Sequence, residues 1–136
     1  MRKGLLTLVT VAALAGVAWA DHPERRQMEQ VRAAADQLAR AAHHVRESAG
    51  HHGGRALGAL DKRAKHFHRQ VERYRNDPRH TEQDFQALAD AYYRALDELH
   101  HMDRHVRDDF RDVEAHMHTL MDYYGDRDHW DGRHRR

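Results

Sequence analysis

The sequence predicts an all-α protein, an antiparallel helical bundle of three long helices, on three observations. Apolar residues recur at alternating three- and four-residue steps along most of the chain, which is the seam of a packed helix, and no strand-like alternation competes with it. Glycine or proline stands where this seam is interrupted. The chain contains no cysteine, so no disulfide framework holds a loop-rich fold together.

The first 20 residues are predicted to be a secretory signal peptide. Arg2 and Lys3 form a basic start, residues 5–17 are apolar, and Ala18-Trp19-Ala20 has the small-x-small pattern of a cleavage site. The apolar stretch is short for a membrane span, and a strongly polar sequence follows from Asp21. We therefore expect cleavage after Ala20, a periplasmic or secreted mature protein, and no stable membrane insertion after cleavage.

The first predicted helix covers residues 23–49 and the second covers residues 55–75. Pro23 suits the first turn of a helix, where its missing N–H would have no partner. Glycines between the two segments mark a turn, and Asn76-Asp77-Pro78 stops the second helix. The seam of the first segment consists of Met28, Val31, Ala35, Leu38, Ala42, Val45 and Ala49, and that of the second consists of Leu57, Leu60, Ala64, Phe67, Val71 and Tyr74.

The third predicted helix covers residues 81–124. Thr81 with Asp84 three residues later resembles a capping box. The seam continues through Phe85, Leu88, Tyr92, Ala95, Leu99, Met102, Val106, Phe110, Val113, Met117, Leu120 and Tyr124. Its steps are regular except for two consecutive fours at 102, 106 and 110, a phase shift that a slightly kinked helix can absorb. The bundle domain is thus expected over residues 21–124, with a disordered polar tail over 125–136.

The length of this third helix leaves two arrangements open. At about 1.5 Å per residue it would be about 65 Å long, nearly twice the length of either partner. Residues 100–105 contain no Gly, Pro or Asn, which favours a continuous helix, whereas Asp103 as an N-cap favours a reversal that makes four helices. A continuous helix would leave an apolar face uncovered and predicts a homo-oligomer; that face consists of Val106, Phe110, Val113, Met117 and Leu120.

Charge and hydroxyl content exclude two classes of function. The chain has 23 Lys and Arg against 22 Asp and Glu, and removal of Arg2 and Lys3 leaves a mature charge near −1. This balance argues against a nucleic-acid partner, which would call for a basic excess. The only mature Ser and Thr residues are Ser48, Thr81 and Thr119, and none lies in a recognisable catalytic motif, so we expect no enzymatic activity.

Histidine is the main functional signal. The chain has 15 histidines, all beyond residue 20, and those inside the predicted helices lie off the seam. Packing therefore does not need them, and folding is expected without metal. Neutral imidazole is a ligand for zinc, copper and nickel, so the sequence predicts binding of divalent transition metals.

The predicted metal site lies at one end of the bundle, where antiparallel folding brings both turns to one level. His101 and His105 are expected to be the strongest pair, because they stand at i, i+4 on one helix face. Only neighbouring pairs of such a stripe converge, since it drifts around the helix. The full set of candidate ligands is His101, His105, Asp97, Asp109, His51 and His52.

Two functions remain open from these patterns. The first is an exported, histidine-rich helical protein that buffers or senses metal ions at the cell envelope. The second is a structural or chaperone-like helical protein whose third helix binds itself or another chain, with incidental histidines on a solvated face.

Overall fold

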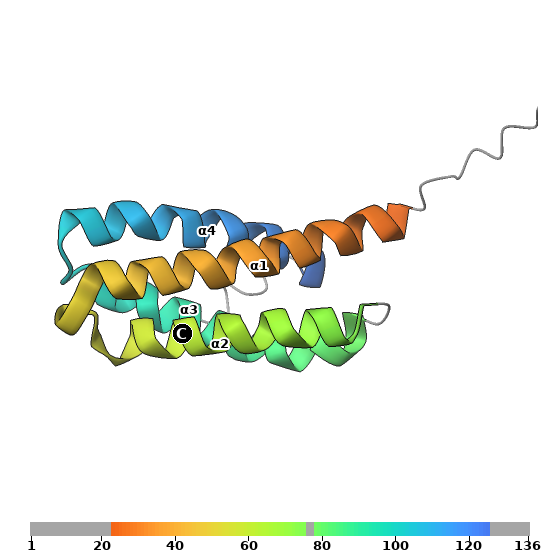
Figure 1. Ribbon diagram of the computed structural model, residues 1–136, viewed down its shortest axis with the longest axis horizontal. Helices are drawn as coiled ribbons and strands as arrows, with labels where there is room; N and C mark the ends of the chain where they lie inside the picture. Colours follow the sequence, from red (N-terminus) through yellow and green to blue (C-terminus); the bar gives the residue numbers. More distant parts are fainter. Residues whose placement is uncertain (1–22, 76–77, 126–136) are drawn as a thin grey trace, which may run out of the picture.

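The computed structural model describes residues 23–75 and 78–125 and confirms the all-α prediction (Figure 1). Its four helices are α1 (Pro23–Ala49), α2 (Gly54–Arg73), α3 (Glu82–Leu99) and α4 (Arg104–Tyr124), with 3₁₀ turns η1 (Gly50–His52) and η2 (Pro78–Thr81). The predicted bounds of the first two helices hold within two residues. The predicted signal peptide and, apart from Gly125, the predicted tail lie outside the described residues.

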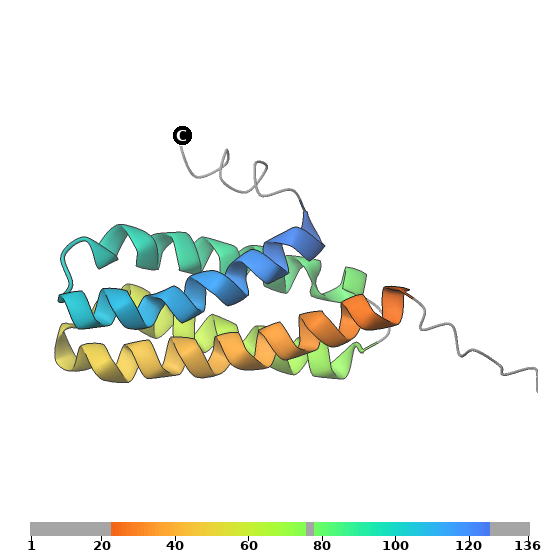
Figure 2. The same ribbon diagram turned by 90° about the horizontal axis from the view of Figure 1, so that it is seen from above.

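The helices form an antiparallel bundle in which α1 lies between α2 and α4 (Figures 1 and 2). Packing is extensive between α1 and α4, α1 and α2, and α2 and α3, whereas α3 and α4 share few contacts. The turns at residues 50–53 and 100–103 lie at the same end of the bundle, on the left in both views. We call this end the tip.

The seam residues predicted from the sequence make the core. Twenty-one of the 25 named seam positions are buried, and the other four, Met28, Tyr74, Met102 and Tyr124, are partly exposed. Phe67, Phe85 and Tyr124 meet at the end opposite the tip, where the rings of Phe85 and Tyr124 stack at 4.5 Å. The apolar periodicity therefore places every helix face correctly.

Of the two arrangements that the sequence left open, the structure has the four-helix one and not the continuous third helix, because the chain reverses between Leu99 and Arg104. The reversal covers the face that a continuous helix would expose; its five residues are all buried. Burial of five such side chains contributes roughly 8–15 kcal/mol, whereas each interrupted helical hydrogen bond costs about 1 kcal/mol. The phase shift in the seam marks this reversal.

The loss of that exposed face removes the premise of the predicted homo-oligomer. It also removes the surface that motivated the structural or chaperone-like alternative. Self-association stays a prediction that needs a different physical basis. Among the described helices, none combines the length and the apolar character needed to cross a membrane.

The predicted capping box at the start of α3 is wrong. Thr81 is the N-cap residue, but its side chain makes no capping hydrogen bond. Its Oγ1 instead lies 2.6 Å from the Oη of Tyr124, so this hydroxyl joins the start of α3 to the end of α4. Thr81 is buried, and a buried hydroxyl takes the partner that it can reach.

Candidate functional site

Histidines from two turns meet at the tip, as the sequence predicts. His52, His101 and His105 line one pocket of about 270 Å³, whose wall also includes Ser48 and Asp103. All three histidines are exposed. The hairpin geometry inferred from the sequence therefore brings these imidazoles to one place.

The helical spacing predicted for His101 and His105 does not hold. His101 lies in the turn that follows α3, whereas His105 is the second residue of α4. Asp97 lies on α3 and lines a separate groove of about 740 Å³ between α3 and α4. His51 does not line the tip pocket. The reversal at residues 100–103 breaks the stripe, and only His105 and Asp109 keep the i, i+4 relation on one helix.

Asp109 faces α1 rather than the tip pocket. Its Oδ2 lies 3.6 Å from Nε2 of His44, which comes from α1. The hydroxyl of Ser48, also on α1, donates a 2.8 Å hydrogen bond to the same oxygen. The carboxylate is thus held between two residues one helical turn apart on the neighbouring helix.

His105 completes this arrangement from one turn earlier on α4. Its Nε2 lies 3.4 Å from the backbone carbonyl oxygen of Ser48. A carbonyl only accepts hydrogen bonds, so this contact places the proton of neutral His105 on Nε2 and leaves a lone pair on Nδ1. Histidines that ligate metals commonly donate their other ring N–H to such a carbonyl.

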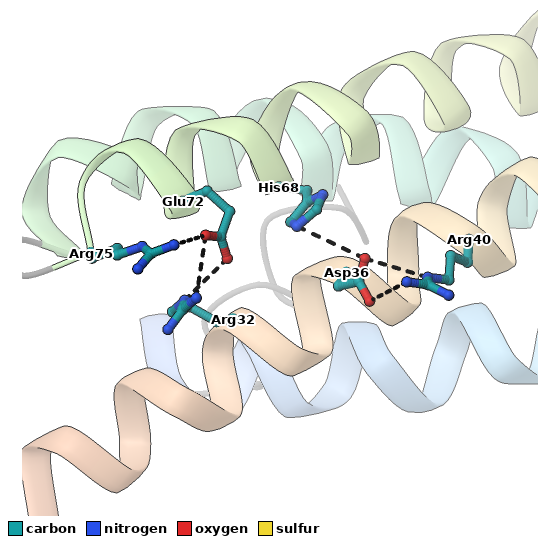
Figure 3. Close-up of polar contacts among 6 residues, drawn as sticks. All are labelled: Arg32, Asp36, Arg40, His68, Glu72 and Arg75. Carbon is teal, nitrogen blue, oxygen red and sulfur yellow. Dashed lines mark hydrogen bonds and ion pairs between the residues drawn. The ribbon is translucent and has the colours of Figure 1, made fainter.

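Two other histidines lie near carboxylates across the α1–α2 interface, but cations already occupy those carboxylates. His68 lies 3.9 Å from Asp36, which pairs with Arg40 at 3.1 Å (Figure 3). A metal ion at this pair would have to displace a guanidinium. The pair therefore fits a structural tie better than a metal site.

His43 lies beside the buried carboxylate of Asp61, at 3.6 Å. Asp61 is 2 % exposed and pairs with Arg46 at 2.8 Å and with Lys65 at 3.0 Å. Burial by itself raises the pKa of Asp61, but the hydrogen bonds from Arg46 and Lys65 outweigh it, so the net pKa is lowered. Arg46 and Lys65 already neutralise this carboxylate and would repel a metal cation.

Farther along the same interface, Arg32 and Arg75 bind Glu72 (Figure 3). The Arg32 guanidinium spans both carboxylate oxygens, at 3.0 and 3.3 Å, and Arg75 lies at 2.9 Å. The hydrogen bond from Arg32 holds the pKa of the Glu72 carboxyl below its ordinary value. These ion pairs fix α2 against α1 and are not a binding site.

A third interface carries one more pair, His66 on α2 and Asp84 on α3, at 3.0 Å. His80 stands four residues before Asp84, but its ring stacks on Tyr74 with centroids 4.9 Å apart. This second group is therefore less available than the one at Asp109.

We call His44, His105 and Asp109 the α1–α4 site. Two imidazoles and one carboxylate are a ligand set suited to zinc, and Asp109 contacts His44 and Ser48, neither of which carries a fixed positive charge. Over the described part of the chain, no group of three or more His, Asp or Glu side chains is arranged to hold an ion as it stands. A bound ion would therefore require side chains at this site to turn.

Sequence reasoning missed His44 and Ser48, although the signal was present. The prediction treated residues 81–124 as one helix, so it did not place the first helix beside residues 104–124. Reflecting the first helix onto residues 104–124 pairs His44 with Asp109 and Ser48 with His105, as the structure does. No protein-family model, curated protein or solved structure matches this chain.

Proposed function

We propose that this protein is exported and binds divalent transition metal ions at the α1–α4 site, buffering or sensing them at the cell envelope. The observation that carries the proposal is the 3.6 Å between Nε2 of His44 and Oδ2 of Asp109, across a helix interface. Adjacent ligand atoms of a tetrahedral zinc ion lie about 3.3 Å apart, given metal–ligand bonds of about 2.0–2.1 Å. The proposed compartment rests on the composition of residues 1–20.

The groups around these side chains support the same reading. Ser48 donates to Asp109 through its hydroxyl and accepts from His105 through its carbonyl. The carbonyl that accepts from His105 orients its ring and raises the basicity of the other ring nitrogen, and the Ser48 hydroxyl orients the Asp109 carboxylate. Ser48 of α1 thus positions two of the three proposed ligands, His105 and Asp109, which both lie on α4.

The exposure of the ligands favours reversible binding over a permanent structural ion. The side chain of His44 is 68 % exposed, so it can turn toward Asp109 without disturbing the core. The seams are apolar without any histidine, so the bundle folds before metal arrives. His52 and His101, in the adjoining tip pocket, supply further imidazoles for weaker binding.

Titration calorimetry of residues 21–136 with zinc, copper and nickel chlorides tests the proposal. Replacement of His44, His105 or Asp109 by Ala should each weaken the tightest binding event by about tenfold or more, and Ser48→Ala should weaken it less. Ligands must be deprotonated, so binding should also weaken as the solution is acidified. Circular dichroism should show the same helical content in every variant.

His116→Ala with His118→Ala is the matched control, because both residues lie on α4 away from the site. This double variant should titrate like the unmodified protein. Loss of binding in His66→Ala or His80→Ala, with none at the α1–α4 site, would move the metal to the α2–α3 interface. Absence of any binding below millimolar metal would support the incidental-histidine alternative.

A further inference from the structure

The turn between α3 and α4 is short and retains helical character. His100 keeps helical angles, with φ −61° and ψ −23°, and Glu98 and Leu99 still accept backbone hydrogen bonds from His101 and Met102 at 3.1 Å. Asp103 is extended, with φ −61° and ψ 153°. The turn contains no glycine or proline, so nothing in its sequence requires the reversal.

Few backbone contacts with α3 hold α4 in its reversed position. These two helices share few contacts, whereas α4 packs extensively along α1. Moving α4 away from its own α3 therefore breaks few backbone contacts, and the ring contacts of Phe85 with Tyr124 and of Tyr92 with Phe110 are the main side-chain packing that it separates. What α4 does require is an α1 to cover its apolar face, which includes the fully buried Phe110, Val113 and Met117.

We propose that the chain also forms a domain-swapped dimer, in which residues 100–103 become helical and α4 packs on α1 of a second copy. Each contact between α1 and α4 then re-forms between chains, including Ser48 with Asp109 and Met28 with Tyr123. The core stays buried and each hinge gains helix, while association costs entropy. The dimer therefore forms at high protein concentration, and its basis is independent of metal.

A disulfide between α1 and α4 distinguishes the two states. The side chains of Ser48 and Asp109 touch at 2.8 Å, and the chain has no native cysteine. Ser48→Cys with Asp109→Cys is oxidised in chelator after gel filtration of concentrated protein. A non-reducing denaturing gel should show an internally linked monomer from the monomer fraction and a chain-to-chain linked dimer from the dimer fraction.

Two substitutions at Asp103 should shift the equilibrium in opposite directions, proline toward the closed monomer and alanine toward the swapped dimer. Proline matches its φ of −61° and removes none of the backbone hydrogen bonds of the described turn, so the closed monomer tolerates it. Proline inside a continuous helix is disfavoured about a hundredfold relative to alanine at each of the two hinges, so Asp103→Pro should dimerise about ten-thousandfold more weakly than Asp103→Ala. Circular dichroism should show both variants to be folded.

The proposal is overturned by any of three results. One is the absence of dimer at every concentration in both the unmodified hinge and Asp103→Ala. Another is a dimer fraction whose disulfides join only residues of the same chain, which would be side-by-side association. The third is a swapped dimer that forms equally well with Asp103→Pro.

Discussion

Asp61 offers the sharpest test of how the bundle is held together, through the variant Asp61→Asn. The carboxylate is 2 % exposed and accepts hydrogen bonds from Arg46 and Lys65. Asparagine keeps the shape but loses the charge, and its amide N–H groups face two donors. The variant should therefore be less stable, because a buried donor is left without an acceptor.

The magnitude follows from the exposure of the partners. Hydrogen bonds to charged groups contribute about 1.5–3 kcal/mol each when buried. The Arg46 and Lys65 side chains are 56 % and 42 % exposed, so water replaces part of what they lose. We expect a loss of about 2–3 kcal/mol in the free energy of unfolding for Asp61→Asn. Asp61→Leu should lose less, about 1 kcal/mol, because both cations can turn to water and an apolar side chain suits the site.

Urea unfolding followed by circular dichroism measures both variants across pH. Because the folded-state pKa of Asp61 is lowered, its contribution is complete at neutral pH and is lost as the pH falls through the folded-state value, below about 4. The gap between the unmodified protein and Asp61→Asn should therefore stay constant from pH 7 to 5 and shrink in stronger acid. Equal stability at pH 7, or a gap that widens in acid, would refute this account of the interface.

Three further predictions concern the core and the ends of the helices. Phe110→Asp should unfold the monomer, because Phe110 is fully buried against Tyr92, at 5.9 Å, and an unpaired buried charge is costly; a folded monomer by circular dichroism would contradict the four-helix topology. Gly54→Ala should lower the free energy of unfolding by about 1 kcal/mol or more, since Gly54 has a φ of +62° and an added Cβ would lie 2.5 Å from Oε2 of Glu98. Gly58→Ala, inside α2 with open space around it, should instead stabilise the protein by up to about 1 kcal/mol. Thermal unfolding measures both, and the reverse order of stability would contradict the described turn. Burial raises the pKa of Tyr124 to about 12, so ultraviolet titration should show its ionisation well above 10 in the native protein, and Tyr124→Phe should remove that step; an unchanged titration curve would contradict this assignment.

Most of the fold could be predicted from the sequence, because burial of one face of each helix places apolar residues at the helical period. Seam positions such as Leu38, Phe67 and Leu88 are fully buried, and the pairs Arg32–Glu72 and Asp36–His68 lie across the first two helices as their antiparallel packing requires. The local sequence did not predict the turn at residues 100–103, because no glycine, proline or asparagine lies there. That turn is set by the burial of a distant helix face, which local propensity does not record.

The candidate site was predicted only in part, for the same reason. The gathering of His52, His101 and His105 follows from turns that meet at one end, and it was found. The role of His44 depends on α4 lying antiparallel to α1, which exists only once the chain reverses. Asp61 was missed because a charged residue beside the seam reads as solvated until its partners from α1 and α2 are placed around it.

The position of a bound metal ion shows whether His44, His105 and Asp109 are the ligands. Anomalous diffraction at the zinc absorption edge, from crystals of residues 21–136 grown with zinc, locates the ion independently of affinity. Binding at the α1–α4 site predicts an anomalous peak within about 2.0–2.2 Å of a ring nitrogen of His44, a ring nitrogen of His105 and an oxygen of Asp109. A well-occupied peak between His66 and Asp84 instead, with none at the α1–α4 site, would contradict it.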